Sequence, residues 1–334
     1  MHRNEARWNV IQLRSEPQAS FETPLTFLWR QALHALRHAV PVQLDPSPRL
    51  LNPSANADHT VRRVQIPLGD SFMPGHLFVP RHDAKGASVC LVHGTSAEQT
   101  LSYYMWIRAL LRAGFQVLTF EMDGHGDNRR PLRVPDVEAN VPAALQFLRS
   151  QPGVNPARLG LLGVSLGGAC ALNALPTETG IKAVVAVSVP AQVELGEWER
   201  LQELVGLFNP ENCQTFLDAT PGPLLRFVTV PVRIGQGLDA LIEEVDLLHP
   251  KTAHHIDAIV RHLDPYGHAA RSDVPVMVIN GDWDNITPRW QAQMLYERIS
   301  APKSFLLVPR RNHFTIMISP QAVDGMVQWF RRWL

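Results

Sequence analysis

A serine set between glycines is the strongest candidate for a reactive side chain in this sequence, because of its residue types and their spacing. In Gly163-Val164-Ser165-Leu166-Gly167, the serine joins an apolar, strand-like run to an apolar small-residue segment typical of a helix. A serine on so sharp a turn needs small residues two positions before and after it, because a Cβ there would collide with the turn. The spacing therefore predicts a nucleophile at Ser165, and a serine that only caps the helix is the alternative interpretation.

The elements that must position this serine follow an alternating order. Turn residues Gly69 and Asp70 join the first two strand-like runs and predict a hairpin. The alternation along the rest of the chain predicts an α/β fold, in which a mostly parallel sheet carries helices on both faces. The expected strands cover residues 60–66, 72–79, 87–92, 115–120, 159–164, 183–189, 274–279 and 304–308, and the expected helices cover 101–113, 137–150, 289–299 and the end of the chain.

Residues 190–272 interrupt this alternation. They contain helical patches over 193–208 and 238–248 but no clear buried strand, and prolines such as Pro250 interrupt the patches. A structureless loop of this length is uncommon in a compact domain, so we expect a helical cap inserted between two sheet strands.

Residues 1–59 precede the first expected strand. Their apolar residues follow helical spacing over 25–40, and prolines end the pattern. We expect an N-terminal helical extension that docks on the main domain, because the helix lacks the basic face of a membrane-surface helix. The main domain then comprises residues 60–189 and 273–334.

Polar residues gather where the expected parallel strands end. His93, Asp123, Ser165, Asp284 and His313 all follow such runs, and open parallel sheets bind ligands outside the carboxyl ends of their strands. This constellation resembles the α/β-hydrolase superfamily, with nucleophile, acid and histidine in that chain order. Within the superfamily it is most similar to the capped serine esterases and lipases. The resemblance covers the main domain and implies an α/β-hydrolase fold.

The resemblance implies the remaining members of a catalytic triad. His313 lies past the last expected strand, where the family carries its histidine, and an imidazole can take up the serine proton at neutral pH. Asp284 matches the spacing of the family's acid after the preceding strand. Asp282 is expected to hydrogen-bond the N–H groups of its own turn instead. Glu194 and Glu197, at the entrance to the insertion, are further candidates for the triad acid.

Two backbone N–H groups are needed to stabilise the oxyanion that forms when serine attacks a carbonyl. Leu166, at the start of the helix after the serine, and Thr95, after the His-Gly pair of a buried strand, are the expected donors. The choice among Gly94, Thr95 and Ser96 for the second donor stays open, because the family's extended His-Gly-Gly-Gly form is absent.

The composition limits the partners of the protein. Lys+Arg and Asp+Glu both number 31, so the total charge favours neither nucleic acid nor an anionic membrane. Cys90, Cys170 and Cys213 are odd in number and indicate free thiols. The polar start lacks a secretory signal and no run is long enough to span a membrane, so we expect a cytoplasmic protein.

Histidines crowd the insertion without the spacing of a metal site. They lack both a His-Glu-x-x-His pattern and a pair of cysteines, so we expect neither a metal nor another cofactor. We also expect His125, in Asp-Gly-His-Gly, to have a structural role. The insertion histidines are His249, His254, His255, His262 and His268.

The combined sequence evidence favours a serine hydrolase that cleaves carboxylic esters of small or medium apolar acyl groups through an acyl-enzyme. Leu204 and Phe208, on the apolar side of the first helical patch, are candidates to line the acyl pocket. The same triad can serve an acyltransferase or a carbon–carbon bond hydrolase. A non-catalytic ligand receptor is the alternative from another class, because a fold alone does not fix function.

Overall fold

The computed structural model of the protein describes residues 59–82, 86–95, 103–125, 128, 130–194, 203 and 250–334. The helical pattern over 25–40 and the patch over 238–248 lie outside the described residues, as do Leu204 and Phe208. The described residues hold every strand expected for the main domain.

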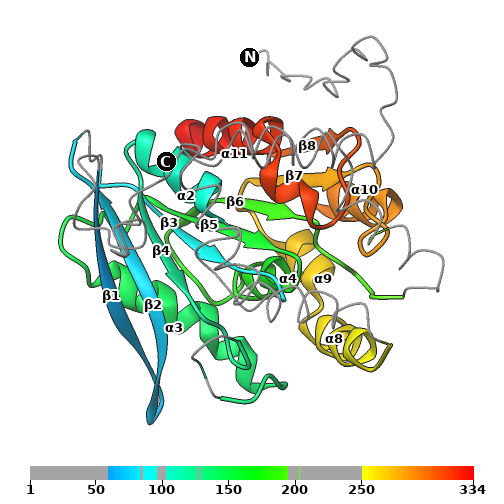
Figure 1. Ribbon diagram of the computed structural model, residues 1–334, viewed down its shortest axis with the longest axis horizontal. Helices are drawn as coiled ribbons and strands as arrows, with labels where there is room; N and C mark the ends of the chain where they lie inside the picture. The colour runs from blue at the N-terminus through cyan, green and yellow to red at the C-terminus, as the bar shows by residue number, and fades with distance from the viewer. Residues whose placement is uncertain are drawn as a thin grey trace, which may run out of the picture.

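In the described part of the chain, eight strands form one mixed sheet in the order β1-β2-β4-β3-β5-β6-β7-β8 (Figure 1). β2 is antiparallel to both of its neighbours and all other pairs are parallel. The pairing of β1 with β2 confirms the predicted hairpin. The strands are β1 (His59–Leu68), β2 (Ser71–Pro80), β3 (Ser88–Val92), β4 (Gln116–Phe120), β5 (Leu159–Val164), β6 (Ile181–Val187), β7 (Val276–Gly281) and β8 (Lys303–Val308).

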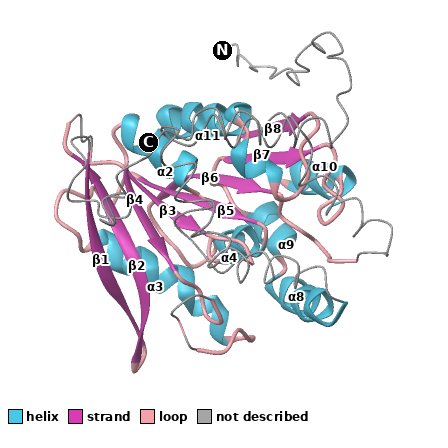
Figure 2. Cartoon of the chain, in the orientation of Figure 1, coloured by secondary structure: helices cyan, strands magenta, loops and turns pink. Residues whose placement is uncertain are grey.

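Helices cover both faces of this sheet (Figure 2). α2 and α11 pack on one face, and α3, α4, α9 and α10 pack on the other. The described helices are α2 (Tyr104–Arg112), η3 (Asp136–Ala139), α3 (Asn140–Arg149), α4 (Leu166–Asn173), α8 (Pro250–Leu263), α9 (Pro265–Arg271), α10 (Arg289–Arg298), η4 (Thr315–Ile318) and α11 (Pro320–Trp333).

The two faces of the sheet bury separate hydrophobic clusters. In β3, Val89 and Leu91 belong to the cluster under α2 and α11, whereas Cys90 and Val92 belong to the cluster under α3 and α4. This split follows from the strand period of two, which sends successive side chains to opposite faces. Every residue of β3, β4 and β5 is buried, so the strand that leads into Ser165 is held on both sides.

α8 and α9 occupy the end of the insertion, which the sequence analysis expected to be helical but in which it named no helical patch beyond residue 248. Pro250, which the sequence analysis placed between helical patches, is the first residue of α8, and Pro265 is likewise the first residue of α9. Proline suits the first helical position, because its fixed φ is helical and its missing N–H has no helical partner there. α9 packs against α4 and α10, so this part of the insertion joins the helical layer of the sheet.

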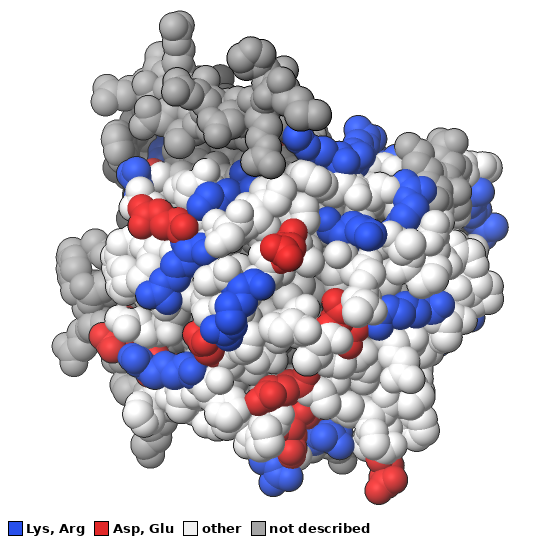
Figure 3. Space-filling view, turned by 180° about the vertical axis from the view of Figure 1, so that it is seen from behind, with Lys and Arg blue, Asp and Glu red and all other residues white. Residues whose placement is uncertain are grey.

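The charges on the described surface are mixed. On the face seen in Figure 3, basic and acidic side chains are scattered among uncharged ones, which agrees with the equal totals of 31. Among the described helices, none combines the length and the apolar character needed to cross a membrane.

Candidate active site

Ser165 lies on a sharp turn between β5 and α4, as the sequence predicts. Its backbone has φ 51° and ψ −122°, a conformation that residues with a side chain rarely adopt. A Cβ on Gly163 would lie 2.6 Å from the Cα of Gly168, and a Cβ on Gly167 would overlap the carbonyl oxygen of His93. These close approaches are the reason that the turn needs glycine at both positions.

Ser165, His313 and Asp284 form a continuous chain of hydrogen bonds. Ser165 Oγ lies 3.0 Å from His313 Nε2, and His313 Nδ1 lies 3.0 and 3.1 Å from the two Asp284 carboxylate oxygens. An ionised carboxylate only accepts hydrogen bonds, so Nδ1 carries the proton and Nε2 accepts from the serine hydroxyl. All three residues are buried. The arrangement can therefore take a proton from Ser165 and hold the resulting imidazolium beside a carboxylate.

Short polar motifs fix the two loops that carry the acid and the histidine. The Asp284 carboxylate accepts a hydrogen bond from the Thr287 backbone N–H at 2.6 Å. In the loop after β8, Asn312 Oδ1 accepts hydrogen bonds from the Thr315 backbone N–H at 2.9 Å and from its hydroxyl at 2.7 Å. Side chains that bond to backbone groups a few residues away close such loops into defined turns. Hydrogen bonds within each loop therefore help to hold that loop in a defined turn.

The remaining carboxylates that the sequence offered as the acid occupy different environments. Glu194 is exposed and forms an ion pair with Arg261, with 3.1 Å between Oε1 and Nη2. Asp282 is hydrogen-bonded to the backbone of Arg310 and Arg311 in the neighbouring loop as well as to its own backbone, and partial burial raises its pKa. Glu197 lies outside the described residues. Asp284 is the carboxylate that meets His313 Nδ1.

The expected oxyanion donors lie at the start of α4 and after β3. Leu166 is the first residue of α4, so its N–H has no partner within the helix. Gly94 lies against the serine turn, where an added Cβ would be 3.2 Å from the serine Cβ, and its N–H donates to the Tyr103 hydroxyl at 2.8 Å. Thr95 is half-buried, and its hydroxyl has no hydrogen-bond partner among the described residues. The Gly94 N–H therefore already has an acceptor, the Tyr103 hydroxyl. Ser96 lies outside the described residues.

His93 and His125 form a second buried histidine environment. His93 Nε2 accepts a hydrogen bond from the Met122 backbone N–H at 3.0 Å, and its Nδ1 lies 2.6 Å from the Gly94 carbonyl oxygen. The His125 ring packs edge-on against it, with 4.9 Å between ring centroids. Burial, followed by the neighbouring His125, lowers the pKa of His93 to about 3. These contacts are those of uncharged histidines that hold loops in place.

Glu203 is the residue of this region that the sequence analysis missed. It is fully buried, its Oε1 accepts a hydrogen bond from the Asn285 N–H at 2.6 Å, and burial and the negative charge of Asp284 raise its pKa to about 7. In the sequence it stands within an apolar helical patch, where one glutamate is expected to face solvent. No local signal identifies it, because its partner Asn285 is 82 residues away.

In the described part of the chain, the other titratable groups do not form a metal site. No three His, Cys, Asp or Glu side chains among the described residues are grouped so that they could hold a metal ion. His262 Nε2 instead lies 2.7 Å from Glu138 Oε1. Cys90 and Cys170 are free, and burial raises the pKa of both thiols, whereas Cys213 lies outside the described residues.

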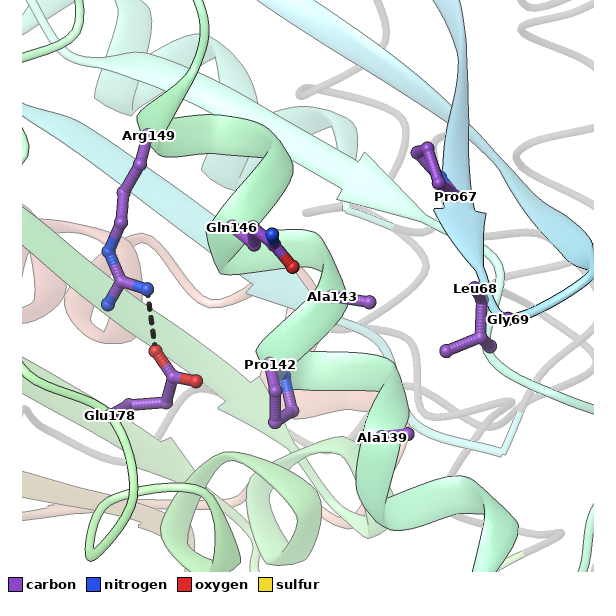
Figure 4. Close-up of a pocket in the computed structure, with 9 residues that line it drawn as sticks. All are labelled: Pro67, Leu68, Gly69, Ala139, Pro142, Ala143, Gln146, Arg149 and Glu178. Carbon is purple, nitrogen blue, oxygen red and sulfur yellow. Dashed lines mark ion pairs between the residues drawn. The ribbon is translucent and has the colours of Figure 1, made fainter.

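A surface cavity of about 440 Å³ lies between the β1–β2 turn and α3 (Figure 4). Its lining includes Arg149 and Glu178, whose Nη1 and Oε2 atoms form an ion pair at 2.7 Å. None of the residues that line this cavity comes from the loops that carry Ser165, Asp284 or His313. The cavity is therefore separate from the candidate active site.

Comparison with known proteins shows which proteins this chain is similar to. Thiohydrolase aneE of Aspergillus aculeatus is 27% identical over 297 residues, which cover 82% of this chain and 92% of that protein. The esterase domain of a Rhodothermus marinus protein has a TM-score of 0.54 at 17% identity, over 82% of this chain and 99% of that chain. Est1E of Butyrivibrio proteoclasticus, solved with ferulic acid bound, has a TM-score of 0.53 at 15% identity, over 80% and 96% of the two chains.

The solved structures share the fold of this chain. Because their sequence identity is low, the similarity shows the fold alone. The sequence profile of the alpha/beta hydrolase family matches residues 91–325, which is more than half of the chain. The matched region includes β5 with its serine turn and both loops after β7 and β8. The chain belongs to the α/β-hydrolase family.

Proposed function

We propose that the protein is a serine hydrolase that cleaves carboxylic esters with small or medium apolar acyl groups. The observation that carries the proposal is the buried chain of hydrogen bonds from Ser165 Oγ through His313 to Asp284, with 3.0 Å at each step. The fold is that of solved esterases, which supports an ester as the substrate class.

In the proposed reaction, Ser165 Oγ attacks the acyl carbonyl carbon while its proton moves to His313 Nε2. The carbonyl oxygen becomes an oxyanion that the N–H groups of Leu166 and Thr95 stabilise. When the tetrahedral intermediate collapses, the carbon–oxygen bond to the alcohol breaks and His313 returns the proton to the leaving oxygen. Water, deprotonated by His313, then attacks the acyl-enzyme and releases the acid and the free serine.

The insertion completes the proposed enzyme as a cap over the serine. We place the cap within residues 190–272, with Leu204 and Phe208 on the acyl pocket, because an apolar helical patch there needs an apolar surface to cover. The 1–59 extension is proposed to dock on the main domain. Contacts of Glu203 with the loops after β7 and β8 support an insertion that reaches the site.

A thioester is the second candidate substrate. It is favoured by the likeness to a protein named thiohydrolase, over most of both chains. The triad serves both substrates in the same way, because the leaving atom, oxygen or sulfur, departs from the same tetrahedral intermediate. A matched pair of acyl groups, presented as the oxygen ester and as the thioester, distinguishes them by kcat/KM.

Hydrolysis of a short-chain p-nitrophenyl ester by wild type and Ser165→Ala tests the proposal. We expect Ser165→Ala to lower kcat by roughly 10⁶, since loss of the nucleophile disables the whole triad. A serine-directed fluorophosphonate should label the peptide that contains Ser165. Equal turnover by the two proteins, or labelling at another serine with loss of activity, would overturn the assignment.

A further inference from the structure

Glu203 belongs to the insertion, yet it contacts both loops that carry the acid and the histidine. Its Oε1 accepts a hydrogen bond from the Asn285 backbone N–H at 2.6 Å. Its backbone carbonyl oxygen accepts a hydrogen bond from the Asn312 side-chain amide at 3.0 Å. Asn285 follows Asp284 and Asn312 precedes His313 in the sequence. One residue of the insertion therefore joins the two loops beside their reacting side chains.

The Glu203 carboxyl is fully enclosed and faces charged groups of the site. Glu203 is 0% exposed, and its Oε2 atom has no hydrogen-bond partner among the described residues. The titratable groups that act on it are Asp284, on the loop after β7, and His313, on the loop after β8. Burial and the charge of Asp284 favour the neutral carboxyl, while the backbone N–H groups of Asn285 and His313 and the charge of His313 favour the ionised one.

A tether alone does not require a carboxyl. The oxygen of a glutamine amide could accept the same bond from Asn285, without the cost of desolvating a charge that a buried carboxylate carries. What glutamate adds at this position is a group that can become negative beside Asp284 and His313. An extra negative charge close to an imidazole stabilises its protonated form.

We propose that Glu203 is a positioning residue, which tethers the Asp284 and His313 loops and, when ionised, adds a second negative charge near the His313 imidazole. The inference rests on the proposed function, because its effect acts on the transfer of the Ser165 proton to His313 Nε2. The proton that Glu203 loses on ionisation goes to solvent. With this carboxyl ionised, the imidazolium that forms during the attack is more stable, so the attack is faster.

The rate at which a fluorophosphonate labels Ser165 isolates this step. The Oγ–phosphorus bond forms, fluoride leaves, and the serine proton passes to His313. Near pH 6, where most of the Glu203 carboxyl is neutral, we expect wild type and Glu203→Gln to be labelled at rates within roughly twofold of each other. Near pH 9, we expect the wild type to be labelled roughly tenfold faster, which corresponds to about one unit in the basicity of His313. Glu194→Gln, a matched change at an exposed glutamate, should follow the wild type at both pH values.

The pH dependence separates the charge from the tether. A Glu203→Gln protein that is slower by the same factor at both pH values, or not slower at either, would overturn the inference, because a purely structural contact acts equally at every pH. Should Glu203→Gln not fold, Glu203→Asp keeps a carboxyl and must retain the rise in labelling rate with pH, although at a lower rate. Loss of that rise would also count against the proposal.

Failure of the proposed function gives a different result. If Ser165→Ala is labelled as fast as wild type, Ser165 is not the nucleophile and the proposed function fails first. If labelling depends on Ser165 but the ratio of wild type to Glu203→Gln does not change with pH, only the role of Glu203 fails.

Discussion

Two buried histidines at the same edge of the sheet have opposite surroundings. His93, after β3, is held by the Met122 N–H and the Gly94 carbonyl oxygen, and only 1% of it is exposed. His313, after β8, lies between the Asp284 carboxylate and the Ser165 hydroxyl, and only 6% of it is exposed. Burial is nearly equal at the two positions, so burial alone does not distinguish the histidine that could act as a base.

The partners of each ring account for the difference. Neutral backbone groups cannot balance the charge of an imidazolium, and desolvation lowers the pKa of His93 to about 3. A carboxylate beside Nδ1 can balance that charge, and a hydroxyl beside Nε2 provides the proton. A buried histidine is thus equipped for general-base chemistry when one ring nitrogen faces a carboxylate and the other faces the group to be deprotonated.

The comparison of His313 with His93 is tested by replacing each with glutamine. The largest expected effect is the fall in kcat in His313→Gln. Without the base, kcat for a short-chain p-nitrophenyl ester should fall by roughly 10⁶, as removal of the histidine does in a well-studied triad. His93→Gln should lower kcat by no more than roughly tenfold, since His93 does not touch the reacting atoms and glutamine can bond the same backbone groups. Urea unfolding of both variants verifies that the kinetic comparison uses folded protein. Equal losses in kcat would show that His93 takes part in the reaction.

Asp284→Asn removes the feature that distinguishes His313 from His93. An asparagine amide can donate to Nδ1, which leaves the proton on Nε2 and makes the ring unable to accept from Ser165. We expect kcat near pH 8 to fall by about 10⁴, the size of the same change in a well-studied triad. Asp282→Asn, two residues away, should cost less than roughly tenfold, because Asp282 bonds backbone groups that an amide oxygen also satisfies. The reverse order would move the acid to Asp282.

The sequence predicted those features of the candidate site that depend on local pattern. Ser165 was found because its strand, turn and helix are contiguous, and the glycines beside it are required by contacts within the same turn. Asp284 and His313 were placed by chain order and by their position after strands, and the structure brings them together with Ser165. Hairpin and sheet followed from turn residues and from the continuous apolar character of buried strands.

The residues that the sequence did not predict depend on distant contacts or on context. The hydrogen-bond partners of Glu203 include Asn285 and Asn312, which are 82 and 109 residues away. The bounds of α8 and α9 were missed because a proline can either end a helix or begin one. A capping contact shows which of the two applies. In α9, Asp264 precedes Pro265 and its side chain accepts a hydrogen bond from the Gly267 N–H at 3.1 Å, which marks a helix start.

The comparison of His93 with His313 also predicts a change of stability with pH. This is the smallest of the expected effects. The pKa of His93 is about 3 in the folded protein and has its ordinary value of 6.5 in the unfolded chain. Between these values the unfolded chain binds a proton that the folded protein does not, so the free energy of unfolding falls as the pH falls. From about pH 7 to about pH 5, this one residue should remove roughly 2 kcal/mol of stability.

His93→Gln has no proton to bind in either state at this position. It should therefore lose about 2 kcal/mol less than wild type between those two pH values, whatever its stability near pH 7. Urea unfolding at both pH values measures the difference, and equal slopes of free energy against urea concentration verify that the unfolded states are comparable. If the two proteins lose stability in parallel, His93 takes up a proton in the folded protein at ordinary pH. The backbone contacts would then not be enough to keep a buried histidine neutral, and the contrast with His313 would disappear.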